Sequence, residues 1–146
     1  MFKVDTKDIE RFSIKIGEKA RKGNETEIRK AIQKSCLSIK KGAIQNITSN
    51  GSVKTGHLRR SIAYKTTYTE GTVHTNNVKY ARSIEDGSKP HIIRAKNKKA
   101  LYWAGASHPV KQVKHPGSKA KPFLKPAFEA EKPKFINNLK EVIKFD

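Results

Sequence analysis

The sequence has little cysteine, methionine or tryptophan, with one residue of each among 146. A single cysteine, Cys36, excludes an internal disulfide and a zinc module built from several cysteines, and it indicates synthesis in a reducing cytoplasm. Long apolar runs are also missing, because the longest nearly apolar stretch, residues 100–106, is far shorter than the ~20 residues that span a bilayer. The first residues lack the order of a signal peptide. We therefore expect a soluble chain without a membrane-spanning segment.

Acidic residues are nearly absent from the middle of the chain. The formal net charge is +19, from 32 basic and 13 acidic residues. Residues 28–128 hold 21 of the basic residues and only three acids, Glu70, Glu85 and Asp86. A surface of this kind attracts polyanions, so nucleic acid, an anionic membrane and an acidic protein partner all fit. Charge alone does not choose among them.

Apolar spacing predicts two helices in the first third of the chain. Ile9, Phe12 and Ile16 recur at helical spacing over residues 5–21, which indicates a short amphipathic helix. A longer helix is expected over residues 25–47. Its apolar stripe consists of Ile28, Ile32, Cys36, Ile39, Ala43 and Ile47. Within that stripe Cys36 is interpreted as a small buried hydrophobic residue and not as a reactive thiol.

From residue 58 the apolar period changes to two, which predicts strands over 62–68, 72–75, 91–95, 101–103 and 110–114. Glu70-Gly71 is the expected turn, and residues 80–85 form one helical turn. A final helix over 122–144 has Pro126 in its first turn and is kinked or interrupted at Pro133.

These elements predict one α+β domain over residues 1–146, with no internal repeat. Its parts are a helical part (1–48), an antiparallel β-meander sheet (58–115) and a C-terminal helix (122–144). No helix-length segment separates successive strands, which argues against parallel βαβ wrapping. The helices are expected to pack on one face of the sheet.

Candidate catalytic groups are scattered along the sequence. The five histidines have no metal-ligand spacing, and no nucleotide-binding glycine loop occurs. His115 beside Lys114 would suit a small toxin-like ribonuclease, with histidine as general base. We prefer the alternative that the histidines lie on the surface and in turns. Glu85 and Asp86 are expected to neutralise nearby cations and not to bind a metal. We therefore predict no enzyme, no catalytic or metal residue and no cofactor.

Two lysine-rich loops, residues 94–99 and 111–121, are the clearest candidates for a binding surface. Lysine without interspersed acid is self-repelling, so a partner that neutralises the charge is expected. No helix concentrates the basic residues, which argues against sequence-specific reading of DNA. The candidate contact residues are Arg94, Lys96, Lys98, Lys99, Lys111, Lys114, Lys119 and Lys121.

Five short segments resemble, in order, the motifs of a known family. The first is Thr55-Gly56-His57-Leu58-Arg59-Arg60-Ser61, similar to Thr-Gly-x-Leu-Arg-x-Ser, and the second is Tyr80-Ala81 with Glu85-Asp86-Gly87-Ser88. The others are Ala100-Leu101-Tyr102-Trp103, then His115-Pro116-Gly117, then Pro122-Phe123-Leu124-Lys125-Pro126-Ala127. Together they resemble the gene-product-ten-like tail component of long-tailed phages and prophages, also called neck, tail-completion or minor tail protein.

The resemblance implies a structural virion protein made in the bacterial cytoplasm and placed at the head–tail junction. It also implies a ring formed on the virion, with other junction and tail proteins as partners and no membrane. The basic loops would then contact an adjoining acidic ring, which we favour, or the DNA in the channel. A small basic nucleic-acid-binding protein or a toxin-like ribonuclease is the alternative function.

Overall fold

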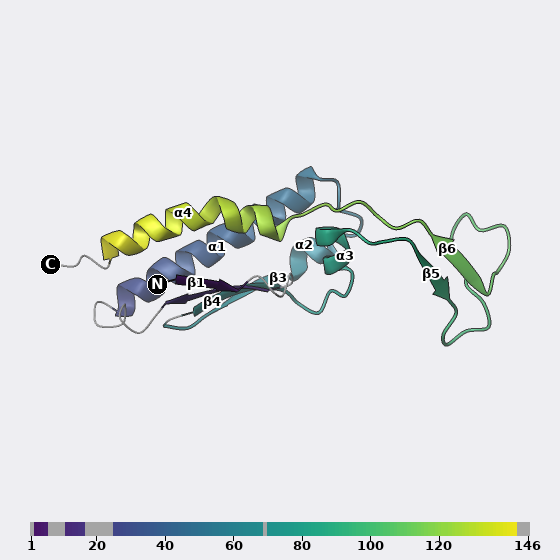
Figure 1. The fold of residues 1–146 in the computed structure, drawn as a ribbon, viewed down its shortest axis with the longest axis horizontal. Coiled ribbons are helices and arrows are strands. Elements are labelled where there is room, and N and C mark those ends of the chain that lie inside the picture. The colour runs from purple at the N-terminus through teal and green to yellow at the C-terminus, as the bar shows by residue number, and fades with distance from the viewer. Residues whose placement is uncertain (1, 6–10, 17–24, 69, 143–146) are drawn as a thin grey trace.

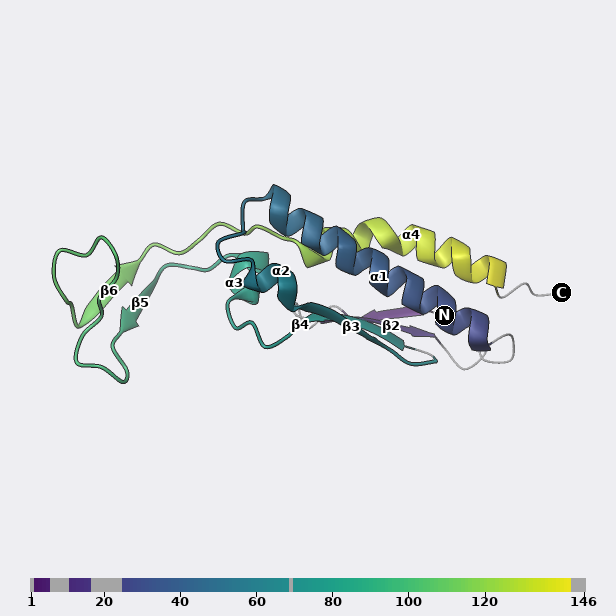
Figure 2. The same ribbon diagram turned by 180° about the vertical axis from the view of Figure 1, so that it is seen from behind.

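The computed structural model describes residues 2–5, 11–16, 25–68 and 70–142. In these residues two long helices lie over one face of a four-stranded antiparallel sheet, and a separate β-hairpin extends from one end (Figures 1 and 2). The arrangement confirms the α+β class, the antiparallel sheet and the helices on one sheet face. Among the described residues, no helix combines the length and the apolar character that crossing a membrane requires.

The two long helices are α1 (Glu25–Ser49) and α4 (Leu124–Val142), which run antiparallel along the length of the body (Figure 1). The predicted stripe of α1 is confirmed, since each of its members is at most 2% exposed. Burial of this stripe against α4 and the sheet supplies the main stabilisation, at roughly 25 cal/mol per Å² of apolar surface. The core residues of α4 are Leu124, Ala127, Phe128, Phe135 and Leu139.

The first strands of the sheet overturn the helix expected over residues 5–21. β1 (Phe2–Asp5) pairs with β2 (Arg11–Ile16), and β2 pairs with β4 (Glu70–Thr75) with Phe12 opposite Val73. Part of this stretch also alternates apolar and polar residues, which is typical of a strand. Residues 11–16 form a strand because they pair with the edge of β4 that β3 leaves open. The residues of the predicted helix outside 5 and 11–16 lie outside the described residues.

β3 (Ile62–Thr66) completes the sheet order β1-β2-β4-β3. The turn expected at Glu70-Gly71 is wrong, because both residues belong to β4 and the Thr67 amide donates to the Glu70 carbonyl at 2.8 Å. A Cβ on Gly71 would collide with the Cys36 sulfur and with Ile32 of α1. This glycine therefore lets the helix approach the sheet closely.

Two short helices flank the β3–β4 hairpin in the sequence, one before β3 and one after β4, and they lie together near the C-terminal end of α1 (Figure 2). α2 (His57–Ser61) occupies the start of the region 58–115 that the sequence assigns to the sheet, and the predicted strand then begins at residue 62 as expected. α3 (Ala81–Asp86) agrees with the helical turn expected over 80–85 and ends at Gly87, whose φ is 75°.

α4 runs from Leu124 to Val142 with Pro133 inside it, so the proline does not interrupt the helix. Phe135 and Leu139 lie beyond the proline and are both buried, which holds the last turns against the body. Before the proline, the buried Glu131 carboxylate accepts hydrogen bonds from the hydroxyls of Ser35 (2.9 Å) and Ser38 (2.6 Å) of α1. Tertiary packing on both sides outweighs the hydrogen bond that proline removes.

The remaining strands, β5 (His91–Arg94) and β6 (Gln112–His115), form their own two-stranded sheet. The sequence predicts one continuous meander, and the structure places these strands away from the main sheet (Figure 1). Every residue of β5 is exposed, so neither of its faces covers the core. Residues 101–103 contribute only an isolated bridge between Leu101 and Val110 in place of the expected strand.

Candidate partner-binding surface

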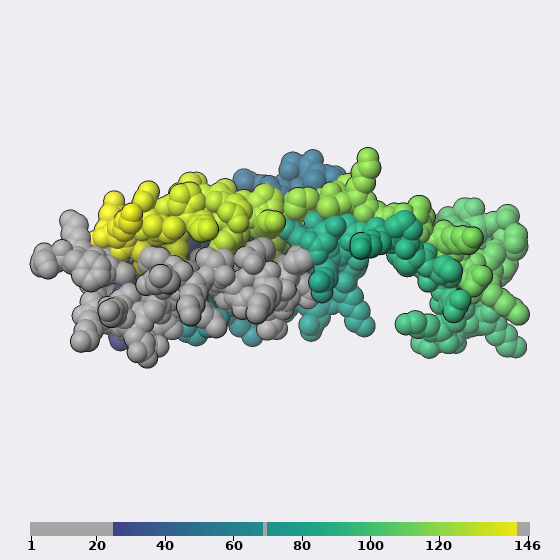
Figure 3. Space-filling view, viewed as in Figure 1, coloured from purple at the N-terminus to yellow at the C-terminus, as the bar shows by residue number. Residues whose placement is uncertain are grey.

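Residues 88–121 form a projection that we call the arm, which leaves the body after α3 and returns to it at α4. The arm continues the long axis of the molecule, and an open hollow separates its lower part from the body (Figure 3). None of its residues is buried. A hairpin without a buried face is at best marginally stable in water, so the arm is suited to contact with a partner.

The base of the arm is fixed by a backbone crossing. Ser88 and Ser118 exchange two N–H···O hydrogen bonds of 2.9 Å each, and their hydroxyl oxygens lie 3.0 Å apart. Gly117, with φ 86°, lies so close to this crossing that a Cβ would collide with the Ser88 carbonyl oxygen. On the other strand, a Cβ on Gly87 would lie 2.6 Å from the Ser118 carbonyl oxygen. Both glycines are therefore required by close backbone contact as well as by positive φ.

Next to this crossing the β5–β6 pairing places His91 opposite His115, with ring centroids 5.0 Å apart. The Nδ1 atom of His115 accepts a hydrogen bond from the Gly117 amide at 3.1 Å, and Pro116 lies between them. Lys114 is the neighbour of His115 along a strand, so the two side chains point to opposite faces. The ribonuclease alternative requires the His115 and Lys114 side chains to act at one site, and the strand geometry does not bring them together. In the described ranges, no group of three His, Cys, Asp or Glu side chains could hold a metal ion.

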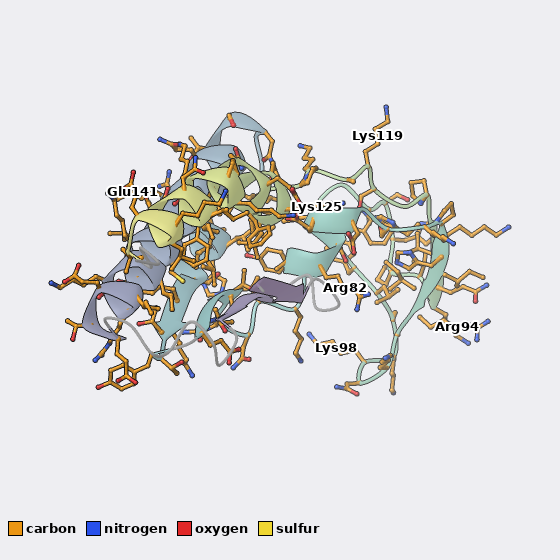
Figure 4. The ribbon with its side chains drawn as sticks, turned by 60° about the vertical axis from the view of Figure 1, so that its left-hand side comes forward. Arg82, Arg94, Lys98, Lys119, Lys125 and Glu141 are labelled. Atoms are coloured by element: carbon orange, nitrogen blue, oxygen red, sulfur yellow. The ribbon has the colours of Figure 1, made fainter. Side chains whose placement is uncertain are left out.

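The arm is positively charged and contains no acidic residue. Arg94, Lys98 and Lys119 point away from it in different directions, so the charge surrounds the arm (Figure 4). Arg94 donates to the Gln112 side chain at 3.4 Å. Within the described part of the chain, the ion pairs are Lys30–Glu27 and Arg82–Asp86, neither of which involves the arm. All eight predicted contact residues are exposed: Arg94, Lys96, Lys98, Lys99, Lys111, Lys114, Lys119 and Lys121.

The arm also exposes large apolar side chains. Tyr102 is 69% exposed and Trp103 is 48% exposed, both in the outer loop, while Ile92 and Ile93 are exposed on β5. The tyrosine of β3, Tyr64, is by contrast packed against the core of the body. Apolar side chains inside a cationic surface are typical of an interface that becomes buried when a partner binds.

Glu85 connects the arm base to α4, a role that sequence reasoning missed. Its buried carboxylate accepts hydrogen bonds from the backbone amides of Phe123 (2.8 Å), Leu124 (3.0 Å) and Lys125 (2.8 Å). It therefore caps the N-terminus of α4, where unpaired amides favour a negative charge. The carboxylate does not neutralise a cation as predicted; its neighbour Asp86 does so, 3.8 Å from Arg82.

This cap joins two of the motif segments. Tyr80, Ala81 and Gly87 begin and end α3, and Ala81 is buried. The other segment, Pro122-Phe123-Leu124-Lys125-Pro126-Ala127, starts α4, with Pro126 in the first turn as predicted. Two further bonds hold the junction, because the Lys121 amide donates to the Ile84 carbonyl at 2.7 Å and the Asn46 side chain to the Phe123 carbonyl at 2.9 Å.

The first motif segment forms α2 and the turn before it. Gly56 has φ 72° and is buried, and the Arg60 side chain reaches back to the Thr55 carbonyl at 3.3 Å. Leu58 is buried, and its carbonyl accepts the Ser61 hydroxyl at 2.7 Å, while Arg59 is exposed. These residues shape backbone turns, and the geometry gives them no nucleophile beside a base.

Comparison with known proteins yields one match. A family model described as "Bacteriophage HK97-gp10, putative tail-component" matches residues 10–87. The matched part runs from before β2 to the end of α3 and stops where the arm begins. No curated protein and no solved structure matches the chain.

Proposed function

The chain belongs to the HK97-gp10-like family of bacteriophage tail components, and from that premise we propose that it works at the head–tail junction as a neck or tail-completion protein. Membership supports a structural role in the phage tail, a place in the virion and contact with other tail proteins. The junction, the tail-completion step, the single domain and a ring of copies are our proposals.

The observation that carries the proposal is the arm. It combines exposed cations, exposed aromatic side chains and no buried residue of its own with a base held by two Ser88–Ser118 backbone hydrogen bonds. A neighbouring protein would order such a projection and neutralise its charge. This dependence on a neighbour suits a subunit of a larger assembly. We propose that an acidic protein ring provides this neighbour, because extensive lysine–phosphate contact would hold DNA that has to pass.

The experiment that tests the arm is a charge-matched pair of triple variants. Lys96, Lys98 and Lys99 changed to Gln should reduce the yield of joined particles in electron micrographs, while the protein still folds. The control changes Lys34, Lys132 and Lys140, exposed lysines of α1 and α4, to Gln. Assembly that responds equally to both sets would contradict a specific role for the arm. Binding of the arm to duplex DNA, lost in the first set alone, would favour the channel DNA as partner.

Deleting the gene tests the junction role more directly. We expect filled heads together with separate or defective tails, because the joining layer would be missing. Infectious particles in normal number would rule the role out. Tails of uncontrolled length would instead identify the neighbouring tail-terminator layer.

We further propose that the isolated chain is monomeric or weakly associated and closes a ring only on the virion. A subunit of charge +19 repels its copies, and the ~10 Å Debye length at 0.1 M salt leaves close neighbours unscreened. In solution this repulsion prevents subunits from closing empty rings. On the virion an acidic partner ring would neutralise the charge and allow the ring to form. Sedimentation at low and high salt measures this; a ring that is stable at low salt would overturn it.

A further inference from the structure

A surface pocket of ≈ 370 Å³ lies at the junction of α1, α2 and α3, close to the base of the arm. Its floor and walls include Ile47, Leu58 and Ile84, and the exposed side chains of Val53 and Tyr80 stand at its edge. The volume is at the lower end of the roughly 300–1,000 Å³ of ligand pockets, which suits a single large side chain.

The pocket has a positive rim. The cations Lys54 and Arg59 line it together with His57, and no acidic side chain does. All three are exposed, so an occupant with carboxylates beside its apolar group could meet them without burying an unpaired charge.

Ser52, one of the residues that line the pocket, has a side-chain hydroxyl without a partner among the described residues. The Ser52 hydroxyl is buried and has no hydrogen-bond partner in the described part of the chain, although the Ser52 amide is bonded to the Ile47 carbonyl and the Asn50 side chain. A buried hydroxyl without a partner destabilises the protein, and a bound acceptor would remove that cost. A peptide carbonyl or carboxylate supplies such an acceptor.

We propose that this pocket binds an aromatic or branched aliphatic side chain of an acidic segment of a partner protein. The apolar lining takes the side chain, the rim takes the flanking carboxylates, and the buried Ser52 hydroxyl turns towards the pocket on binding and donates to a segment oxygen. A second copy's arm does not meet this requirement, since its Tyr102 and Trp103 lie among lysines that the rim repels. Nucleic acid fits less well, because a buried base needs more polar partners than Ser52 offers.

The test uses the purified full chain and three pentapeptides. One has a central Phe between Asp-Glu pairs, the second has a central Ala in the same context, and the third has a central Phe between Lys pairs. We expect the acidic Phe peptide to bind at least about tenfold more tightly than either other peptide, and to shift the amide resonances of Ser52 and Gly56.

Matched variants locate the binding. Tyr80→Ala should weaken the acidic Phe peptide about fivefold to tenfold, while Tyr102→Ala, which removes an exposed tyrosine from the arm, should leave it unchanged. Lys54→Gln with Arg59→Gln should weaken it about tenfold at low salt, and Lys34→Gln with Lys132→Gln much less. Urea unfolding verifies that each variant is folded.

Three results would overturn the proposal: no binding at millimolar peptide, equal binding of the Phe and Ala peptides, or equal loss in the rim and control variants. Self-association of the wild type that Tyr80→Ala abolishes would replace the acidic partner with a second copy. Because the assay needs no virion, it can fail while the junction role stands, and the reverse also holds.

Discussion

The body and the arm of this protein contrast in every physical property that decides stability. The body, made of α1, α4 and the four-stranded sheet with α2 and α3, contains all the buried hydrophobic residues of the described chain. The arm contains none, yet it has exposed aromatic side chains and cations without nearby acids. The difference teaches that the body is held by burial within one chain, whereas the arm depends on what it binds.

The largest expected effect compares one aromatic residue from each region. Phe128→Ala, in the core, should lower the free energy of unfolding by about 3–5 kcal/mol because it leaves a cavity. Trp103→Ala, in the arm, should change it by less than about 0.5 kcal/mol and should weaken assembly instead. Urea denaturation measures both. A destabilisation of similar size in the two variants would mean that the arm packs on the body in solution.

Glu85 lies where the two regions meet, so its removal tests whether the junction belongs to the body. Glu85→Ala leaves three backbone amides of α4 without their acceptor, which should cost about 2–3 kcal/mol of stability. Glu85→Gln keeps one acceptor oxygen and should cost less. Asp86→Ala is the control, since its exposed ion pair contributes about 0–1 kcal/mol. Indistinguishable unfolding curves for Glu85→Ala and Asp86→Ala would disprove the cap.

Cys36 tests whether water reaches the core of the body. Burial, with the Glu131 charge as a smaller cause, raises the pKa of the Cys36 thiol from 9.0 to about 12. Above pH 9 the unfolded thiol therefore loses its proton while the folded one keeps it, so stability falls as pH rises from 9 towards 12.

Between pH 8 and 10 the wild type should lose about 1 kcal/mol more than Cys36→Ala does, as measured by urea unfolding at each pH. The alanine variant is less stable at every pH because it leaves a cavity, and only the difference in slope reports the thiol. Parallel pH profiles would show that water reaches the sulfur in the folded state.

The smallest change in the free energy of unfolding should come from a substitution at the arm base. Gly117→Ala forces a Cβ onto the Ser88 carbonyl, so amide exchange at Ser88 and Ser118 should accelerate about tenfold or more while the body changes by less than about 0.5 kcal/mol. Gly105→Ala is the matched control, because Gly105 also has positive φ but has nothing within 4 Å. Unchanged exchange in Gly117→Ala would mean that the crossing is already open in solution.

The sequence by itself determined the elements whose signal is local and repeated. The sequence predicted α1, its buried stripe and the burial of Cys36 from apolar spacing over consecutive residues, and it also predicted the helical turn at α3. The motif order also indicated the tail-component family, which the match over residues 10–87 confirms. These features need no knowledge of distant partners.

Only the tertiary structure decided the features that depend on pairing across long stretches of chain. Residues 11–16 carry both a helical and an alternating pattern, and the open edge of β4 selects the strand. Gly71 resembles a turn residue until α1 is seen against it, and Glu85 caps a helix that begins 39 residues later. The separation of the arm from the main sheet also depends on long-range pairing, because an apolar period of two does not specify which sheet a strand joins.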